Sequence, residues 1–194
     1  MALLETMLLE GNDYTFQQLR HMFEAARGML QEGVVGPTDY KVSQRAAGAN
    51  LSVDVAAGDA WVNLDTGTRQ GYYLQTNDGT VNVAIAAAHA TLPRVDQVIL
   101  QINDSNVPAG SGNLPELKVL TGTPTAGATL DNRLGAAALG NDRIRLADVH
   151  VPATDTTIAD AQIRDRRPWA RGATLTIETG NNKGATILFR LVIP

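Results

Sequence analysis

The sequence contains no cysteine, which excludes disulfide bridges and thiolate metal sites. Aromatic residues make up only 5% of the 194 residues, and charged residues 19%. No apolar run approaches the roughly 18 residues that a membrane span needs, so we expect no membrane insertion. Sixteen basic residues against 20 acidic ones give a net charge of −4. Because no basic field is present, we expect no nucleic-acid partner.

What the chain has in quantity is small aliphatic and turn-forming residues. Hydrophobic residues make up 44% of it, and it holds 18 glycines and 8 prolines. A chain of this length fits one domain, or one domain with appendages. Such a domain buries about 70% of its extended-chain surface, enough for a real core.

The first ten residues, MALLETMLLE, are apolar but hold two glutamates and no basic residue. A secretory signal needs a basic start and an uninterrupted apolar stretch, so this segment is not predicted to be one. Two interpretations stay open: a short helix or arm that packs on its own domain, and an arm that docks on a neighbouring subunit. Four leucines are too many for a free, solvated terminus. They are Leu3, Leu4, Leu8 and Leu9.

An amphipathic helix is predicted over residues 15–31. Thr15 and Gln18 form a T-x-x-Q capping box at its start, and Gly33 follows its end. The helix either covers a sheet or bundles with copies of itself. Its apolar face comprises Phe16, Leu19, Met22, Phe23, Ala26 and Leu30.

After Pro37 the apolar period changes from 3.6 to 2, which predicts strands. Gly58-Asp59 is predicted to form a turn, and Asn77-Asp78-Gly79 a β-hairpin. In the run 94–103, Val98, Leu100 and Ile102 are predicted to face inward, and Gln97, Gln101 and Asn103 outward. Residues 104–114 and 122–140 are predicted to be loops. The predicted strands are 40–46, 51–55, 60–64, 71–76, 81–85, 94–103, 116–121 and 143–151.

A C-terminal hairpin is predicted from strands at 173–179 and 185–193. Its second strand is apolar on both faces, so both faces should be covered. Burial by another subunit is the simplest way to cover them. The oligomer or docking residues predicted here are Leu188, Phe189 and Val192, together with the four N-terminal leucines and, on the helix, Phe16, Leu19 and Phe23.

Many short strands separated by frequent turns predict a mainly β fold. We expect an antiparallel β-sandwich or barrel with one N-terminal amphipathic helix and a C-terminal β-hairpin. The predicted division is a helical arm at 1–36, the β module at 37–167, and the hairpin at 168–194 as an oligomerisation or docking element.

The sequence offers no recognisable catalytic, cofactor or metal site. The three histidines stand far apart, and neither G-x-S-x-G nor a phosphate-binding glycine loop occurs. Trp61 and Trp169 are interpreted as packing residues. One dense charge cluster is interpreted as a salt-bridged turn that closes the domain, with a subunit-interface anchor as the alternative. It comprises Asp160, Arg164, Asp165, Arg166 and Arg167.

Seven stretches, taken in order, resemble a module of minor tail or fibre-type structural proteins of tailed bacteriophages, especially those of actinobacteria. They span residues 33–167. The stretches are GVV at 33–35, AGANLSVDVAAGDAWV at 47–62, QGYYL at 70–74, PRVDQVILQIND at 93–104, PELKVLTGTP at 115–124, RLADVHVPA at 145–153 and IADAQIRDRR at 158–167.

This resemblance implies a non-enzymatic virion structural protein that assembles in the host cytoplasm. It implies a homotrimer, in contact with other virion proteins, that anchors or forms a tail-tip, baseplate or fibre appendage. In many relatives a longer receptor-binding region follows the arginine motif, whereas the hairpin follows here, which favours an anchoring role. The alternatives are a capsid-attached head fibre or decoration protein, and a receptor- or glycan-binding protein that uses loops 104–114 and 122–140. An enzyme acting on the cell wall is a further alternative.

Overall fold

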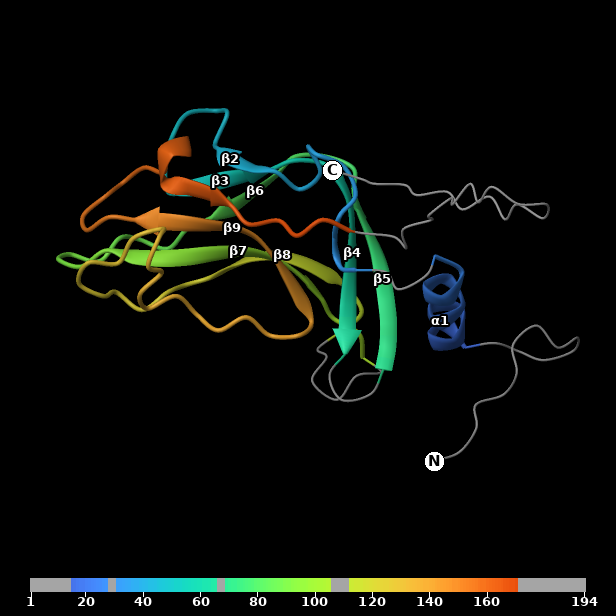
Figure 1. Ribbon diagram of the computed structural model, residues 1–194. Coiled ribbons are helices and arrows are strands. Elements are labelled where there is room, and N and C mark those ends of the chain that lie inside the picture. The colour runs from blue at the N-terminus through green and yellow to red at the C-terminus, as the bar shows by residue number, and fades with distance from the viewer. Residues whose placement is uncertain (1–14, 28–30, 66–68, 106–111, 171–194) are drawn as a thin grey trace, which may run out of the picture.

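The computed structural model describes residues 15–27, 31–65, 69–105 and 112–170. Within them the chain forms three antiparallel β-sheets and one helix near the N-terminus (Figure 1). The predicted mainly β, antiparallel fold class is therefore confirmed. The predicted C-terminal hairpin, with Leu188, Phe189 and Val192, lies outside the described residues.

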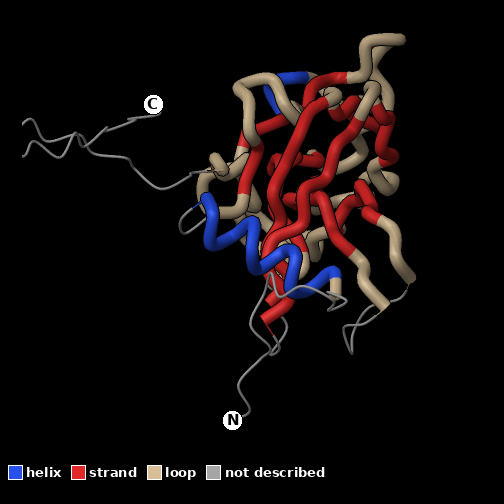
Figure 2. Tube along the Cα trace, turned by 90° about the vertical axis from the view of Figure 1, so that its right-hand side faces the viewer, coloured by secondary structure: helices blue, strands red, loops and turns tan. Residues whose placement is uncertain are grey.

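The first sheet has the order β1-β4-β5 and carries the helix α1 (Phe16–Arg27) on its β5 side. Figure 2 shows α1 lying over the strands. β4 and β5 form a long antiparallel hairpin with a register shift between Asn63 and Asp65. The strands are β1 (Gly33–Val34), β4 (Gly58–Asp65) and β5 (Arg69–Asn77).

The second and third sheets complete the fold. The second has the order β10-β9-β7-β8 and the third the order β2-β3-β6. In Figure 1, β4 and β5 run across the direction of β7 and β9. The strands of the second sheet are β7 (Arg94–Ile102), β8 (Pro115–Leu120), β9 (Arg143–Val151) and β10 (Ile163–Asp165). Those of the third are β2 (Val42–Gln44), β3 (Ser52–Val55) and β6 (Val81–Ala84).

One hydrophobic core joins the three sheets in a sandwich-like arrangement. The first sheet contributes Val34 and Val62, the third Val53, and the second Val98 and other aliphatic residues, each with no exposed surface. The sheets are separate rather than parts of one closed barrel. Small β-branched residues suit such a core because they pack well on pleated surfaces.

β7 is the central strand of the second sheet, and all nine of its residues are buried. Val98, Leu100 and Ile102 face the shared core, as predicted. The prediction that Gln97 and Gln101 face outward into solvent is wrong, because other parts of the chain cover them. Gln97 Nε2 donates to the carbonyl of Ala137, in the 122–140 loop, at 2.5 Å. Gln101 Nε2 donates to Asp142 Oδ2 at 2.8 Å.

Two local predictions about turns are wrong. Gly58 and Asp59 are the first residues of β4 rather than a turn. Gly58 has φ +150°, and a Cβ there would lie 2.4 Å from Asp39 Cα, so the glycine permits a close approach of two chain segments. The Asn77-Asp78-Gly79 turn does not close a hairpin: β5 before it pairs with β4, and β6 after it pairs with β3.

A buried ion pair lies at the start of β7. Arg94 and Asp96 stand two residues apart on the strand, and their side chains are 4% and 0% exposed with Nε–Oδ1 at 2.9 Å. Asp96 Oδ1 also accepts the N–H of Gly122 at 2.8 Å. Arg94 donates onward to the carbonyl groups of Ala86 and Ala87. The pair therefore ties the end of β8 and the β6–β7 connection to one strand.

The charge cluster near residue 165 is paired within the chain. Arg167 Nε donates to Asp165 at 2.9 Å, and its Nη1 donates to the carbonyl of Asp39 at 2.6 Å. Arg166 Nε lies 2.8 Å from Asp148, a carboxylate with no exposed surface that also pairs with Arg133. These contacts favour the salt-bridged closing turn over the interface anchor.

The chain enters and leaves the β structure at neighbouring points. Val34 N donates to the carbonyl of Pro168, and Ala170 N donates to the carbonyl of Val34, both at 2.9 Å. Val34 and Trp169 form a parallel bridge. Val34, in the predicted arm 1–36, thus bonds to Pro168 and Ala170, in the predicted segment 168–194. The division into three parts itself stays a prediction. No helix among the described residues is long and apolar enough to cross a membrane.

Candidate interaction surface at helix α1

Helix α1 carries the described members of the predicted docking set. Phe16 is the first residue of the helix and is 81% exposed, and Leu19 is half-buried. Phe23 also falls within α1, but its side chain lies outside what the structure describes. Leu3, Leu4, Leu8 and Leu9 precede the described residues.

The predicted capping box of α1 is present. Thr15 Oγ1 accepts the N–H of Gln18 at 3.2 Å, and Gln18 Oε1 accepts the N–H of Thr15 at 2.8 Å. These reciprocal bonds satisfy backbone donors that a helix start leaves unpaired. The described helix ends at Arg27, and residues 28–30 lie outside the described part.

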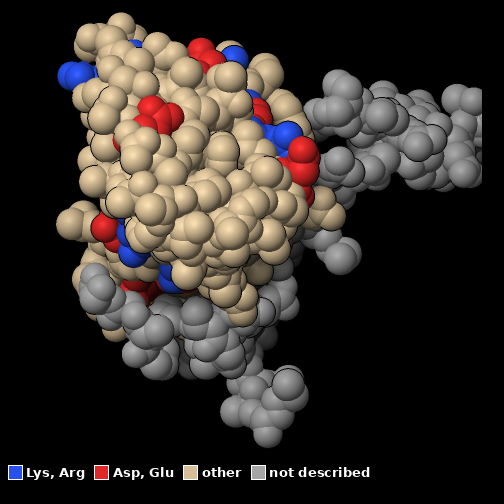
Figure 3. All heavy atoms as spheres, turned by 90° about the vertical axis from the view of Figure 1, so that its left-hand side faces the viewer, with Lys and Arg blue, Asp and Glu red and all other residues tan. Residues whose placement is uncertain are grey.

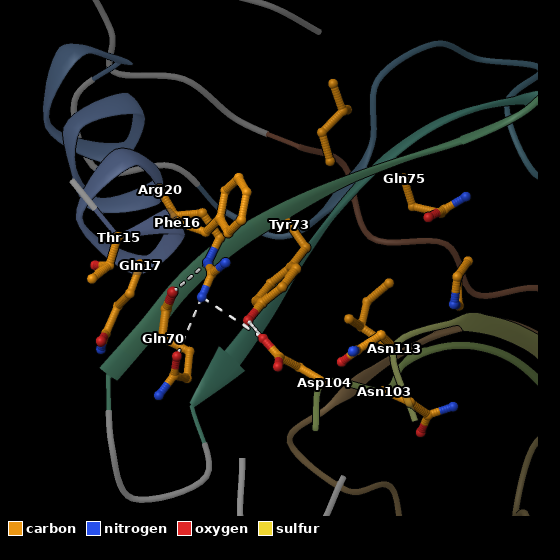
Figure 4. Close-up of a pocket in the computed structure, with 13 residues that line it drawn as sticks. Thr15, Phe16, Gln17, Arg20, Gln70, Tyr73, Gln75, Asn103, Asp104 and Asn113 are labelled. Atoms are coloured by element: carbon orange, nitrogen blue, oxygen red, sulfur yellow. Dashed lines mark hydrogen bonds and ion pairs between the residues drawn. The ribbon is translucent and has the colours of Figure 1, made fainter. Parts of the chain in front are cut away.

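The helix docks on β5 through a residue of its polar side. Arg20 Nε donates to the carbonyl of Gln70 at 2.8 Å, and the guanidinium lies over the ring of Tyr73, 4.1 Å from its centroid (Figure 4). Arg20 Nη2 also lies 3.8 Å from Asp104 Oδ2. A cation over an aromatic face beside a carboxylate is a favourable, specific anchor.

Asp104 connects this anchor to the second sheet. It follows β7, is 8% exposed, and accepts a short hydrogen bond from the hydroxyl of Tyr73 on β5. Burial, and next the bond to Asp104, raise the pKa of the Tyr73 hydroxyl, so Tyr73 stays neutral and donates. The helix, β5 and the end of β7 therefore meet at one polar cluster.

Gly71 on β5 allows the helix to approach closely. Its φ is +79°, and a Cβ there would lie 3.1 Å from His21 Cδ2 and 3.3 Å from Arg20 Cβ. A side chain would therefore require Arg20 and His21 to shift by a few tenths of an ångström, and it would also adopt a strained backbone conformation. Arg20 and His21 therefore lie against β5, while Phe16, at the start of α1, stays exposed.

A hollow of about 850 Å³ lies beside this anchor, between α1, β5 and the ends of β7 and β8. Figure 4 shows Phe16 and Arg20 projecting from the helix at its rim, with Tyr73 and Asp104 below. Leu74, on β5, lines it and is 53% exposed. Leu114, just before β8, is 74% exposed. Phe16 and Leu74, two exposed apolar residues that line the same hollow, indicate a contact surface.

Arg20→Ala should loosen α1 without unfolding the β module. The substitution removes the cation–π contact and the hydrogen bond to Gln70, which together are worth about 1–2 kcal/mol. We expect faster amide hydrogen exchange in residues 16–27 and nearly unchanged protection in β7. Lys118→Ala, which breaks an exposed pair with Glu116, is the matched control. Equal exchange of α1 in both variants would contradict this role of Arg20.

The described residues offer few other candidate sites. They contain no group of three or more His, Asp or Glu side chains placed to hold a metal ion. Figure 3 shows that the face at the left of Figure 1 is mostly neither acidic nor basic, with charges in small mixed groups. The feature with the clearest arrangement is thus the exposed surface at α1 rather than a reactive centre.

Comparisons of the chain with protein families, with curated proteins and with solved structures found no match.

The sequence alone does not predict the residues that hold α1 on β5. Tyr73 and Asp104 appeared only as a strand residue and as part of a polar loop. The one available signal was Arg20, a long cation at the centre of the helix's polar side, but its partners lie 50 or more residues away in sequence. Spacing along one element does not predict such partners.

Proposed function

We propose that this chain is a non-enzymatic structural protein of a tailed-bacteriophage particle. It acts as an oligomeric, trimeric anchoring module of a tail tip, baseplate or fibre, and it contacts other virion proteins. The observation that carries the proposal is that Arg20 holds α1 on β5 while Phe16, an apolar residue of the same helix, stays 81% exposed.

Self-association is supported by the spacing of apolar residues in α1. Phe16, Leu19, Phe23 and Ala26 are three, four and three residues apart, which is the repeat of a helix that packs against other helices. Within the described residues α1 is the one α-helix, so a helical partner there would have to come from elsewhere. An identical helix from another copy of the chain presents the same row of apolar residues.

The phage assignment is supported by the sequence resemblance and by where its stretches lie. Residues 47–62 span β3 and the start of β4, 93–104 contain β7, and 145–153 fall mostly within β9. These strands contribute to one core. The stretches therefore behave as parts of a single packed module, as a shared domain requires.

Imaging tests the proposal directly. Particles would be purified from the phage whose genome encodes this chain, and labelled with a gold-conjugated antibody raised against it. We expect label at the tail tip or baseplate in threefold-related positions. Label confined to the head would instead support the capsid decoration protein, and particles without the chain in label and mass spectrometry would overturn the virion assignment.

A further inference from the structure

A second hollow shares no lining residue with the one beside α1. It measures about 880 Å³, within the range of small-molecule sites, and is open to solvent. Its lining includes Glu32, Asn63 of β4, Tyr72 of β5, Asn141, Arg143 and Trp169. The sequence analysis treated Trp169 as a packing residue, yet it is 40% exposed.

Trp169 is held in place although its side chain is exposed. The residues on both sides of it, Pro168 and Ala170, are hydrogen-bonded to Val34 at 2.9 Å, and Trp169 itself bridges to that strand. A large aromatic side chain on a fixed backbone loses little conformational entropy when it binds a ligand. Such a side chain provides a preformed apolar surface at the edge of the hollow.

The polar groups that line the hollow include amides, one carboxylate, the hydroxyl of Tyr72 and one guanidinium. Asn63 and exposed Asn141 provide amide groups, and Glu32 Oε2 accepts the N–H of Asn63 at 3.4 Å. Burial raises the pKa of Glu32, and the hydrogen bond from the N–H of Asn63 opposes that effect. Among the described residues that line the hollow, the one cation is Arg143, whose Nε is already paired with Asp142 Oδ1 at 2.6 Å.

We infer that this hollow binds a neutral saccharide. A pyranose presents one face of C–H groups and a rim of hydroxyls, which act both as donors and as acceptors. The aromatic side chains suit the C–H face, and amide and carboxylate groups suit the hydroxyls. Because Asp142 balances the charge of Arg143 and the described lining has no other cation, an anionic sugar would meet no uncompensated positive charge. The inference concerns a site separate from α1 and does not depend on the assembly proposal.

Titration calorimetry with four neutral trisaccharides tests this inference: maltotriose, cellotriose, mannotriose and chitotriose. We expect the full-length chain to bind at least one of them with a dissociation constant of about 1 mM or lower. Trp169→Ala should weaken that binding at least tenfold, and Asn141→Ala several-fold. Leu74→Ala, an exposed apolar residue at the other hollow, is the matched control and should bind as the unsubstituted chain does.

Three results would overturn the inference: no binding of any trisaccharide at about 10 mM, unchanged binding by a folded Trp169→Ala, or tighter binding of the anionic sialyllactose than of every neutral sugar. If Trp169→Ala fails to fold, as thermal unfolding would show, the exposed Asn141→Ala decides the outcome. Light scattering of Trp169→Ala should give the same molar mass as the unsubstituted chain, which separates this site from assembly.

Discussion

Replacing Asp96 with alanine should lower the free energy of unfolding by about 3–5 kcal/mol. The carboxylate has no exposed surface and accepts bonds from Arg94 Nε and from the N–H of Gly122. Its removal leaves the Arg94 guanidinium, 4% exposed, as an uncompensated buried charge, and leaves a backbone donor without its acceptor. Chemical denaturation followed by circular dichroism measures the loss.

Two further variants isolate the cause of that loss. Glu116→Ala breaks an exposed pair with Lys118 and should cost less than about 1 kcal/mol. The double variant Arg94→Met with Asp96→Val leaves no buried charge, so it should be less destabilised than Asp96→Ala alone. An Asp96→Ala chain as stable as Glu116→Ala would show that the pair contributes nothing.

Phe16→Glu should dissociate the oligomer while leaving the β module folded. Phe16 is 81% exposed and outside the core, so the substitution should change the thermal midpoint little. In a seam between helices, however, a buried glutamate is strongly unfavourable. We expect self-association at least tenfold weaker, which is a loss of about 1.4 kcal/mol or more. Analytical ultracentrifugation over a dilution series gives the molar mass.

Leu134→Glu is the control for this experiment, because Leu134 is an apolar residue 44% exposed in the 122–140 loop, far in sequence from α1. It should assemble like the unsubstituted chain. The proposal fails if the unsubstituted chain is already a monomer at about 10 μM. It fails as well if Phe16→Glu and Leu134→Glu give the same mass as the unsubstituted chain.

The sequence predicted correctly the features that depend on neighbouring residues in the chain, such as the bounds of one strand and the start of the helix. β9 (Arg143–Val151) matches its predicted bounds because nine residues of mostly alternating character permit little else. The start of α1 matches because Thr15 and Gln18 cap it within one turn. Each of these depends on residues that are close in sequence.

The failures concern partners that are distant in sequence. The Asn77-Asp78-Gly79 turn has good hairpin chemistry, but the strands on its two sides pair with β4 and β3 in different sheets. Gln97 looked solvated because nothing in its own strand indicated that the loop carrying Ala137 would cover it. Composition and periodicity describe a strand's faces, and the rest of the chain decides what covers them.

The bonds of Val34 to Pro168 and Ala170 have a consequence for engineering. Because residues 33 and 169 lie side by side, the folded unit between them has adjacent ends, and adjacent ends are what insertion into another protein's surface loop requires. Residues 33–169 could thus be transplanted as a cassette that leaves the host loop's two attachment points undisturbed. A natural chain built this way can gain or exchange whatever precedes Gly33 or follows Ala170 without rebuilding the β-sheets between them.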